Sequence, residues 1–139
     1  MQTLTVLITG SSSGIGAALA RDFAKRGARL VLVARRTDRL EALASQLRQG
    51  GSEVLVVSGD VTRDGDMERA TEAAIRTFGV LDVVVANAGF GVQGLFTKLT
   101  LDDVRRQFET NVFGVLRTFY ATYPALKDTK GRFVIIGSV

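Results

Sequence analysis

The stretch Thr9-Gly10-Ser11-Ser12-Ser13-Gly14-Ile15-Gly16 (residues 9–16) is a glycine-rich turn that decides the fold of this chain. It follows the apolar run 4–8, which is typical of a buried strand. It opens onto residues 17–24, whose apolar positions recur with helical spacing. A glycine pattern placed between a strand and a helix predicts a site for phosphate groups.

The three glycines explain why this turn suits a phosphate ligand. Gly10 and Gly14 can adopt backbone angles that other residues avoid, and without a Cβ they let a ligand approach the main chain. Gly16 lets the new helix pack closely on the strand. The unpaired N–H groups and the positive dipole end of that helix then face the ligand. A dinucleotide site is therefore the first hypothesis.

Two other interpretations of the turn remain to be weighed. The simpler one is an ordinary strand-to-helix turn that needs glycine for its backbone. The other is the nucleophile elbow of a hydrolase, since Gly10-Ser11-Ser12-Ser13-Gly14 matches G-x-S-x-G. That elbow needs an imidazole to accept the serine proton, and the chain contains no histidine. The serine-hydrolase hypothesis is excluded.

Length and composition bound the remaining possibilities. The 139 residues, of which 46% are hydrophobic and one is proline, predict a single domain over 1–139 with a buried core. No apolar run is long enough to span a membrane, and no basic leader precedes the first strand, so we expect a cytoplasmic protein. The absence of cysteine and histidine argues against disulfides, a thiol nucleophile and a metal site. The net charge of +4 is spread along the chain, which argues against nucleic acid as a partner.

Strand-like and helical patterns alternate along the whole chain. The strand-like runs are apolar almost throughout, as in strands buried on both faces of a parallel sheet. Alternation of this kind predicts a doubly wound α/β fold, in which ligands bind at the carboxyl ends of the strands. We expect five strands, at 4–8, 29–34, 53–58, 81–86 and 132–136, and helices at about 14–26, 38–49, 63–78 and 101–126.

Two arginines follow the second expected strand. Arg35 and Arg36 lie about 20 residues beyond the glycine-rich turn, where an acidic residue would bind the ribose 2′-hydroxyl of NAD. Guanidinium groups instead suit a 2′-phosphate. A solvated pair of loop arginines is the alternative. The position favours NADP(H) over NAD(H).

Polar and small residues follow the other strands. Asp60 stands after the third strand, where it could accept the adenine amino group or simply cap the next helix. Asn87, Ala88 and Gly89 follow the fourth strand and would let a ligand pass close, although such residues are also common in turns. In the fourth helix, Asn111 and the nearby Gly114 predict either a kink beside a site or a tolerated local weakness.

Taken together, these motifs resemble those of the short-chain dehydrogenase/reductase family, whose fold is Rossmann-like. The resemblance implies that the cofactor's phosphates and ribose bind to the glycine-rich turn, through Gly10, Ser12, Ser13, Gly14, Ile15 and Gly16. It implies that Arg35 and Arg36 select NADP(H), that Asp60 and Val61 hold the adenine, and that Asn87, Ala88 and Gly89 line the ribose. It further implies catalytic roles for two residues: Asn111, which would order a proton-relay water, and Ser138, which would bind the substrate's carbonyl or hydroxyl.

The chain departs from the family in one respect. Members carry a proton-donating tyrosine in Tyr-x-x-x-Lys on the helix after the fifth strand, and this sequence stops before that helix. A literal match at Tyr123–Lys127 is rejected, because it would lie at the far end of the fourth helix from the cofactor. We therefore expect an oxidoreductase acting on a carbonyl or alcohol, present here as an incomplete domain that binds cofactor without turnover. A non-catalytic dinucleotide-binding protein is the alternative.

The last strand adds an expectation about assembly. Residues 133–136 are apolar and would form an exposed edge strand of the sheet. Such an edge favours self-association, and the family resemblance also implies homo-oligomers.

Overall fold

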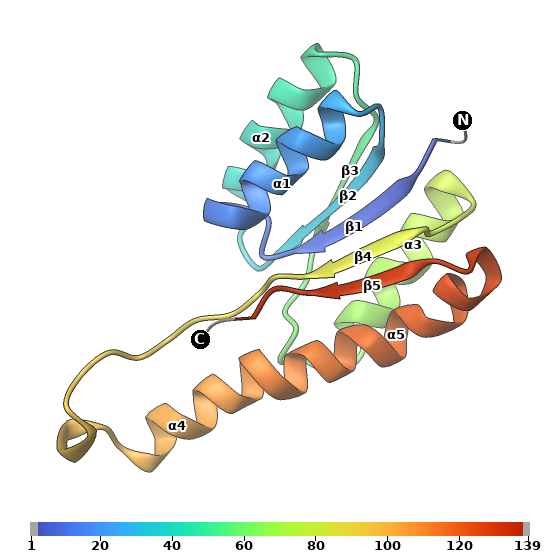
Figure 1. Cartoon of the computed structure of the whole chain (residues 1–139). Coiled ribbons are helices and arrows are strands. Elements are labelled where there is room, and N and C mark those ends of the chain that lie inside the picture. Colours follow the sequence, from blue (N-terminus) through green and yellow to red (C-terminus); the bar gives the residue numbers. More distant parts are fainter. Residues whose placement is uncertain (1–2, 138–139) are drawn as a thin grey trace.

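The computed structural model describes residues 3–137 and contains one sheet of five parallel strands (Figure 1). The sheet order is β3-β2-β1-β4-β5. The order runs outward from β1 to β3 and then returns to β4 on the other side of β1, which confirms the predicted doubly wound sheet. The strands are β1 (Thr5–Thr9), β2 (Arg29–Ala34), β3 (Val54–Ser58), β4 (Val83–Ala86) and β5 (Arg132–Ile135).

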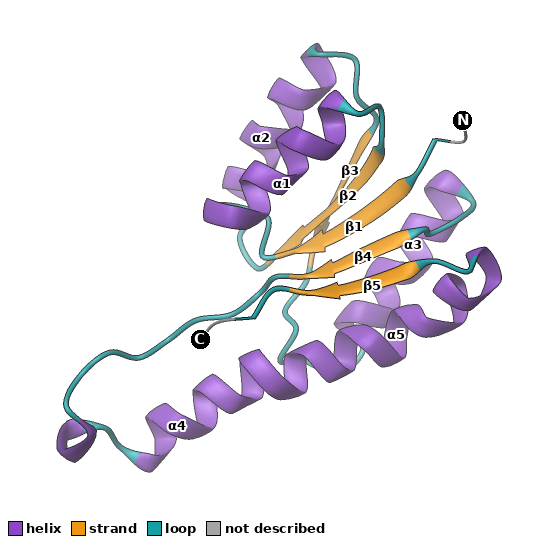
Figure 2. Ribbon diagram, viewed as in Figure 1, coloured by secondary structure: helices purple, strands orange, loops and turns teal. Residues whose placement is uncertain are grey.

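Helices cover both faces of the sheet (Figure 2). One layer consists of α1 (Gly14–Lys25) and α2 (Thr37–Gln49), and the other of α3 (Asp66–Phe78) and α5 (Gly114–Thr129). A short 3-10 turn, η1, leads into α4, and a π-helical segment joins α4 to α5, so that α4 extends past the carboxyl ends of the strands. These three elements are η1 (Phe96–Lys98), α4 (Leu101–Phe108) and the π segment (Glu109–Phe113).

Successive side chains along each central strand pack alternately into two separate hydrophobic cores, one on each face of the sheet. In β1, Ile8 points toward α1 and α2, whereas Leu7 points toward α3 and α5. Leu32 and Val31 of β2 alternate in the same way. Because both faces of the central strands are covered, the strands read as continuous apolar runs in the sequence.

Several expected boundaries differ from the structure by one to three residues, and the helices show the largest differences. Helix α3 begins at Asp66 instead of residue 63, because Asp60 accepts hydrogen bonds from the Thr62 backbone and hydroxyl and so holds a turn there. The predicted helix 101–126 is divided by the π segment and continues to Thr129. Pro124 lies inside α5 without ending it.

The fifth strand lies at an edge of the sheet, as predicted. Its side chains are largely exposed, including Val134 and Ile135. Among residues 3–137, no helix is both long enough and apolar enough to cross a membrane.

Candidate functional site

A cleft of about 1330 Å³ opens at the carboxyl ends of the strands. It gathers residues from every loop that leaves this edge of the sheet. Twelve of the residues predicted from the sequence line it, namely Gly10, Ser12, Ser13, Ile15, Arg35, Arg36, Asp60, Val61, Asn87, Ala88, Gly89 and Asn111. Two predicted residues, Gly14 and Gly16, lie in the same turn but do not line the cleft. Ser138 lies outside the described residues.

The three glycines of the β1–α1 turn are required for different reasons, namely backbone angle, close packing or both. Gly10 has φ +62°, and a Cβ there would come within 2.9 Å of Ala88 Cα. Gly14 has φ +58° but open space around it. A Cβ on Gly16 would overlap the carbonyl oxygen of Gly10 and come within 2.6 Å of Asn87 Nδ2. The close packing expected of Gly16 is therefore against its own turn and Asn87.

Partly buried hydrogen bonds tie this turn to the end of β4. Thr9 Oγ1 accepts from the backbone N–H groups of Asn87 and Ala88, both at 3.0 Å, and Asn87 Nδ2 donates to Gly10 O at 3.1 Å. Ser11 is fully buried, and its hydroxyl donates to carbonyls of β1 and β2. The sequence-based prediction did not assign these roles to Thr9 and Ser11, although both residues belong to the quoted stretch.

The first turn of α1 is open toward the cleft. Ser13 precedes it in an extended conformation, and no side chain caps the helix. The turn carries no acidic residue, in contrast to the first turns of α3 and α4. Its N–H groups and positive dipole end are thus available to an anion.

Three arginines lie together at the end of β2. Arg35 and Arg36 are exposed, and α2 begins directly after them at Thr37. Arg39 in the first turn of α2 also lines the cleft, and the sequence-based prediction missed it. The sequence signal for Arg39 was its place in a group of three arginines within five residues at the end of a strand.

Asp60 is held in the ionised form. Partial burial would raise the pKa of Asp60, but hydrogen bonds from Thr62 and the nearby charges of Arg35 and Arg63 bring that pKa below its usual value. Both hydrogen bonds from Thr62 go to Oδ1, which leaves Oδ2 for another donor. Asp60 does not cap α3; Asp66 instead accepts from the Asp60 N–H at 2.9 Å.

Val61 contributes mostly to packing. It is buried, and its side chain fits against Gly114, where a Cβ would lie 2.7 Å from Val61 Cγ2. The missing side chain of Gly114 therefore lets the start of α5 approach the loop after β3.

Asn111 connects the π segment to the loop after β4. Its Oδ1 accepts from the Phe90 N–H at 3.0 Å, and its Nδ2 donates to the Phe90 carbonyl at 2.7 Å. The kink predicted at this position is a π turn, which interrupts the regular i→i−4 ladder. Phe90 was not predicted; its place directly after Asn87-Ala88-Gly89 was the signal.

Comparison with known proteins agrees with this geometry. A family model described as short chain dehydrogenase matches residues 4–139. The chain belongs to the short-chain dehydrogenase/reductase family. It is 42% identical to an 11-beta-hydroxysteroid dehydrogenase-like protein of Arabidopsis thaliana, covering 96% of this chain and 44% of the relative. The chain thus spans less than half of that curated relative.

Solved structures of the family show the same fold. An alcohol dehydrogenase from Thermococcus sibiricus, complexed with 5-hydroxy-NADP, has a TM-score of 0.92 and 38% identity, covering 96% of this chain and 57% of that one. A short chain dehydrogenase/reductase from Burkholderia phymatum in complex with NAD has a TM-score of 0.93 and 29% identity, covering 99% of this chain and 50% of that one.

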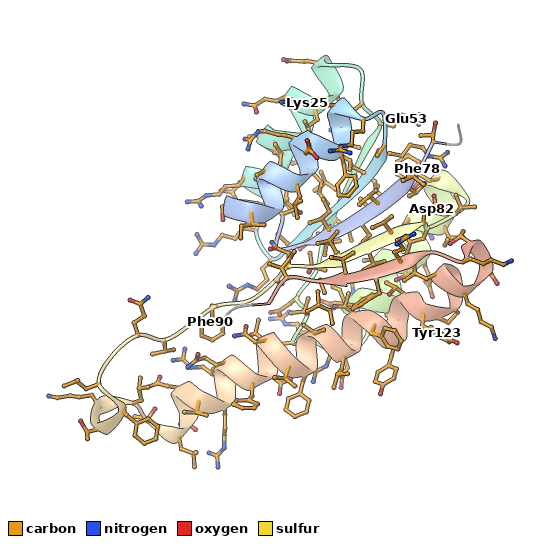
Figure 3. The ribbon with its side chains drawn as sticks, viewed as in Figure 1. Lys25, Glu53, Phe78, Asp82, Phe90 and Tyr123 are labelled. Atoms are coloured by element: carbon orange, nitrogen blue, oxygen red, sulfur yellow. The ribbon has the colours of Figure 1, made fainter. Side chains whose placement is uncertain are left out.

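The Tyr-x-x-x-Lys match of this short-chain dehydrogenase/reductase chain lies away from the cleft. Tyr123 stands on α5, where its ring packs against that of Phe119 at 5.5 Å between centroids. Figure 3 shows Tyr123 pointing away from the sheet, far from Phe90. The chain has two tyrosines, Tyr120 and Tyr123, and neither lines the cleft.

Proposed function

We propose that this chain is the cofactor-binding portion of an NADP(H)-dependent oxidoreductase that acts on a carbonyl or alcohol. The observation that best supports this proposal is a cleft in which three features meet: the uncapped start of α1, the arginines after β2 and the loop after β4. The bound nicotinamide would supply the hydride donor or acceptor. The residues of the chain bind and orient it.

The arrangement of the cleft suggests how a dinucleotide lies in it. The pyrophosphate would bind the N–H groups at the start of α1, beside Ser12 and Ser13. Asp60 Oδ2 can accept from the adenine amino group, with Val61 beside it. The backbone of Asn87, Ala88 and Gly89, held by Thr9, would line the ribose next to the nicotinamide.

The arginines support the choice of NADP(H). Arg35 and Arg36, joined by Arg39, present permanent positive charge where a 2′-phosphate would lie. The relatives provide precedents for both cofactors, because one solved structure holds an NADP derivative and another holds NAD. The charge of this chain's own residues therefore supports the preference.

Turnover by the 139-residue chain is not expected. Neither tyrosine lines the cleft, so the proton donor expected for this family is missing from it. The Asn111 amide makes one hydrogen bond at each end with Phe90, which leaves one lone pair on Oδ1 and one N–H on Nδ2 for a relay water.

The substrate end of the cleft is partly apolar. Phe90, which contacts Asn111, lines the cleft together with Val115 and Ile136. We infer that an apolar carbonyl or alcohol compound would be accepted there, in keeping with the hydroxysteroid names of several relatives. Cytoplasmic location and the absence of nucleic-acid and membrane partners stay predictions.

Self-association remains part of the proposal. Large apolar side chains are exposed along the π segment, α5 and β5, including Phe113, Leu116, Tyr120 and Ile135. Burying them against a second copy would be favourable. A chain that stays monomeric and monodisperse at high concentration would contradict this proposal.

The cofactor proposal can be tested by titration. NADPH and NADH are added to the 139-residue chain while nicotinamide fluorescence is followed. We expect NADPH to bind at least about tenfold tighter, since a charge-assisted arginine–phosphate contact contributes about 1.5–3 kcal/mol. Arg35→Asp should remove this preference. Arg21→Asp, the same charge change on an exposed part of α1, should preserve it. Equal affinities that Arg35→Asp leaves unchanged would refute the proposal.

A further inference from the structure

Arg117 links the loop after β3 to the π segment without lining the cleft. Its side chain is 27% exposed, and its Nε donates to Asp64 Oδ1 at 2.8 Å. Its Nη1 lies 2.6 Å from Glu109 Oε1, an ion pair without the alignment of a regular hydrogen bond. Asp64 belongs to the loop after β3 that carries Asp60, and Glu109 is the first residue of the π segment.

The pair Glu109–Arg117 depends on the π turn. An α-helix rotates about 100° per residue, so residues eight apart would point about 80° away from each other. A π turn adds one residue, which makes the eighth residue equivalent to the seventh, about 20° from alignment. The 2.6 Å contact therefore favours the π register over a regular helix.

The π register in turn decides where Asn111 points. Asn111 lies within the π segment, between the two charged partners, and holds both backbone groups of Phe90. Removing the extra residue from the turn would rotate Asn111 by about 100° relative to α5 and break both bonds. The contact of Gly114 with Val61 fixes α5 against the loop after β3, so α5 itself does not rotate to compensate.

We propose that Arg117 is a positioning residue that fixes the register of the π segment and so aims the Asn111 amide at Phe90. Its anchor on the other side is Asp64, which ties the register to the loop that carries Asp60. The importance for activity rests on the proposed function, because the Asn111–Phe90 contact shapes the nicotinamide side of the cleft.

The test measures hydrogen exchange of the Phe90 amide by NMR in the 139-residue chain without cofactor. In Arg117→Leu, we expect this amide to exchange about tenfold faster, while amides in β1 and β2 keep their rates. Arg117→Lys should restore part of the protection, because it retains the charge but not the two-pronged donor. Arg117→Met, which fills similar space without a charge, should give no such rescue.

Two further variants make the test decisive. Glu109→Gln should reproduce most of the effect of Arg117→Leu, and it decides the question if Arg117→Leu does not fold. Arg105→Leu is the matched control, since Arg105 forms an exposed 3.3 Å pair with Asp102 on α4 and does not line the cleft. Unchanged Phe90 exchange in Arg117→Leu, or an equal change in Arg105→Leu, would overturn the proposal.

A cofactor titration separates this inference from the proposed function. If the inference holds, NADPH affinity falls about fivefold in Arg117→Leu and stays at the wild-type value in Arg105→Leu. If the wild-type chain binds neither dinucleotide, the proposed function fails. The exchange result at Phe90 still decides the role of Arg117.

Discussion

The cleft is built from two regions that are held in different ways. The β1–α1 turn depends on glycine backbone and buried hydrogen bonds, with Thr9 and Ser11 almost wholly buried. The π segment depends on contacts nearer to solvent, namely the exposed hydrogen bonds of the Asn111 amide and the ion pairs of the half-buried Arg117. Breaking a buried hydrogen bond costs more stability than breaking an exposed one, because water cannot replace the lost partner. The first region should therefore be the more rigid wall of the cleft.

The largest expected effect is at Gly16. In Gly16→Ala, the new Cβ would overlap Gly10 O, so the turn must shift, with a loss of about 3 kcal/mol or more and of cofactor binding. Gly14→Ala is the matched control, since nothing lies within 4 Å and only the positive φ causes strain, about 1 kcal/mol. Urea unfolding and NADPH titration measure both variants. Equal losses at the two glycines would show that a small shift of the turn relieves the overlap at Gly16.

Thr9 should show the next largest effect. Thr9→Val leaves the partly buried N–H groups of Asn87 and Ala88 without their acceptor, which should lower the free energy of unfolding by about 2 kcal/mol. Thr9→Ser retains the hydroxyl and should lose much less. Thr100→Val removes the exposed cap of α4 and should cost only about 1 kcal/mol. If the two valine variants unfold at the same denaturant concentration, burial does not distinguish the regions.

Asn111 should have a smaller effect on stability than on local order. In Asn111→Ala, both hydrogen bonds to Phe90 are lost, but their groups are exposed and water can replace the amide. The expected loss of unfolding free energy is below about 1 kcal/mol. The same protein should show faster exchange at the Phe90 amide, by NMR. A loss as large as that of Thr9→Val would remove the contrast between the regions.

The smallest expected effect is the pH dependence of the loop after β3. Hydrogen bonding to the Asp60 N–H, more than any other contact, lowers the pKa of Asp66. A lowered folded-state pKa means that this stabilisation is present above the unfolded pKa of about 3.9 and is lost as pH falls through the folded value. Stability should therefore decline below about pH 4, and Asp66→Asn should flatten that decline. Asp102→Asn, at an exposed carboxylate on α4, is the control and should leave the decline unchanged.

Sequence patterning anticipated the sheet well, for a physical reason. The strands are apolar because two helix layers cover them, and the glycines mark turns that local sterics demand. The edge position of β5 and the bounds of β2 were predicted correctly in the same way, whereas β4 begins two residues later than expected. The start of α3 was wrong by three residues, because the hydrogen bonds that Asp60 and Thr62 form compete with helix formation.

The sequence by itself determined the fold class and the residues that meet at the cleft, because apolar strands that alternate with helices imply a doubly wound sheet whose ligand-binding loops follow the carboxyl ends of the strands. Tertiary structure decided what those residues do there. Gly16 packs against its own turn, Asn87 and Asn111 hold backbone, and Arg117 reaches across two elements to Glu109 and Asp64. These roles depend on contacts between residues up to 77 positions apart, such as Asn87 with Gly10, and no local pattern encodes such contacts.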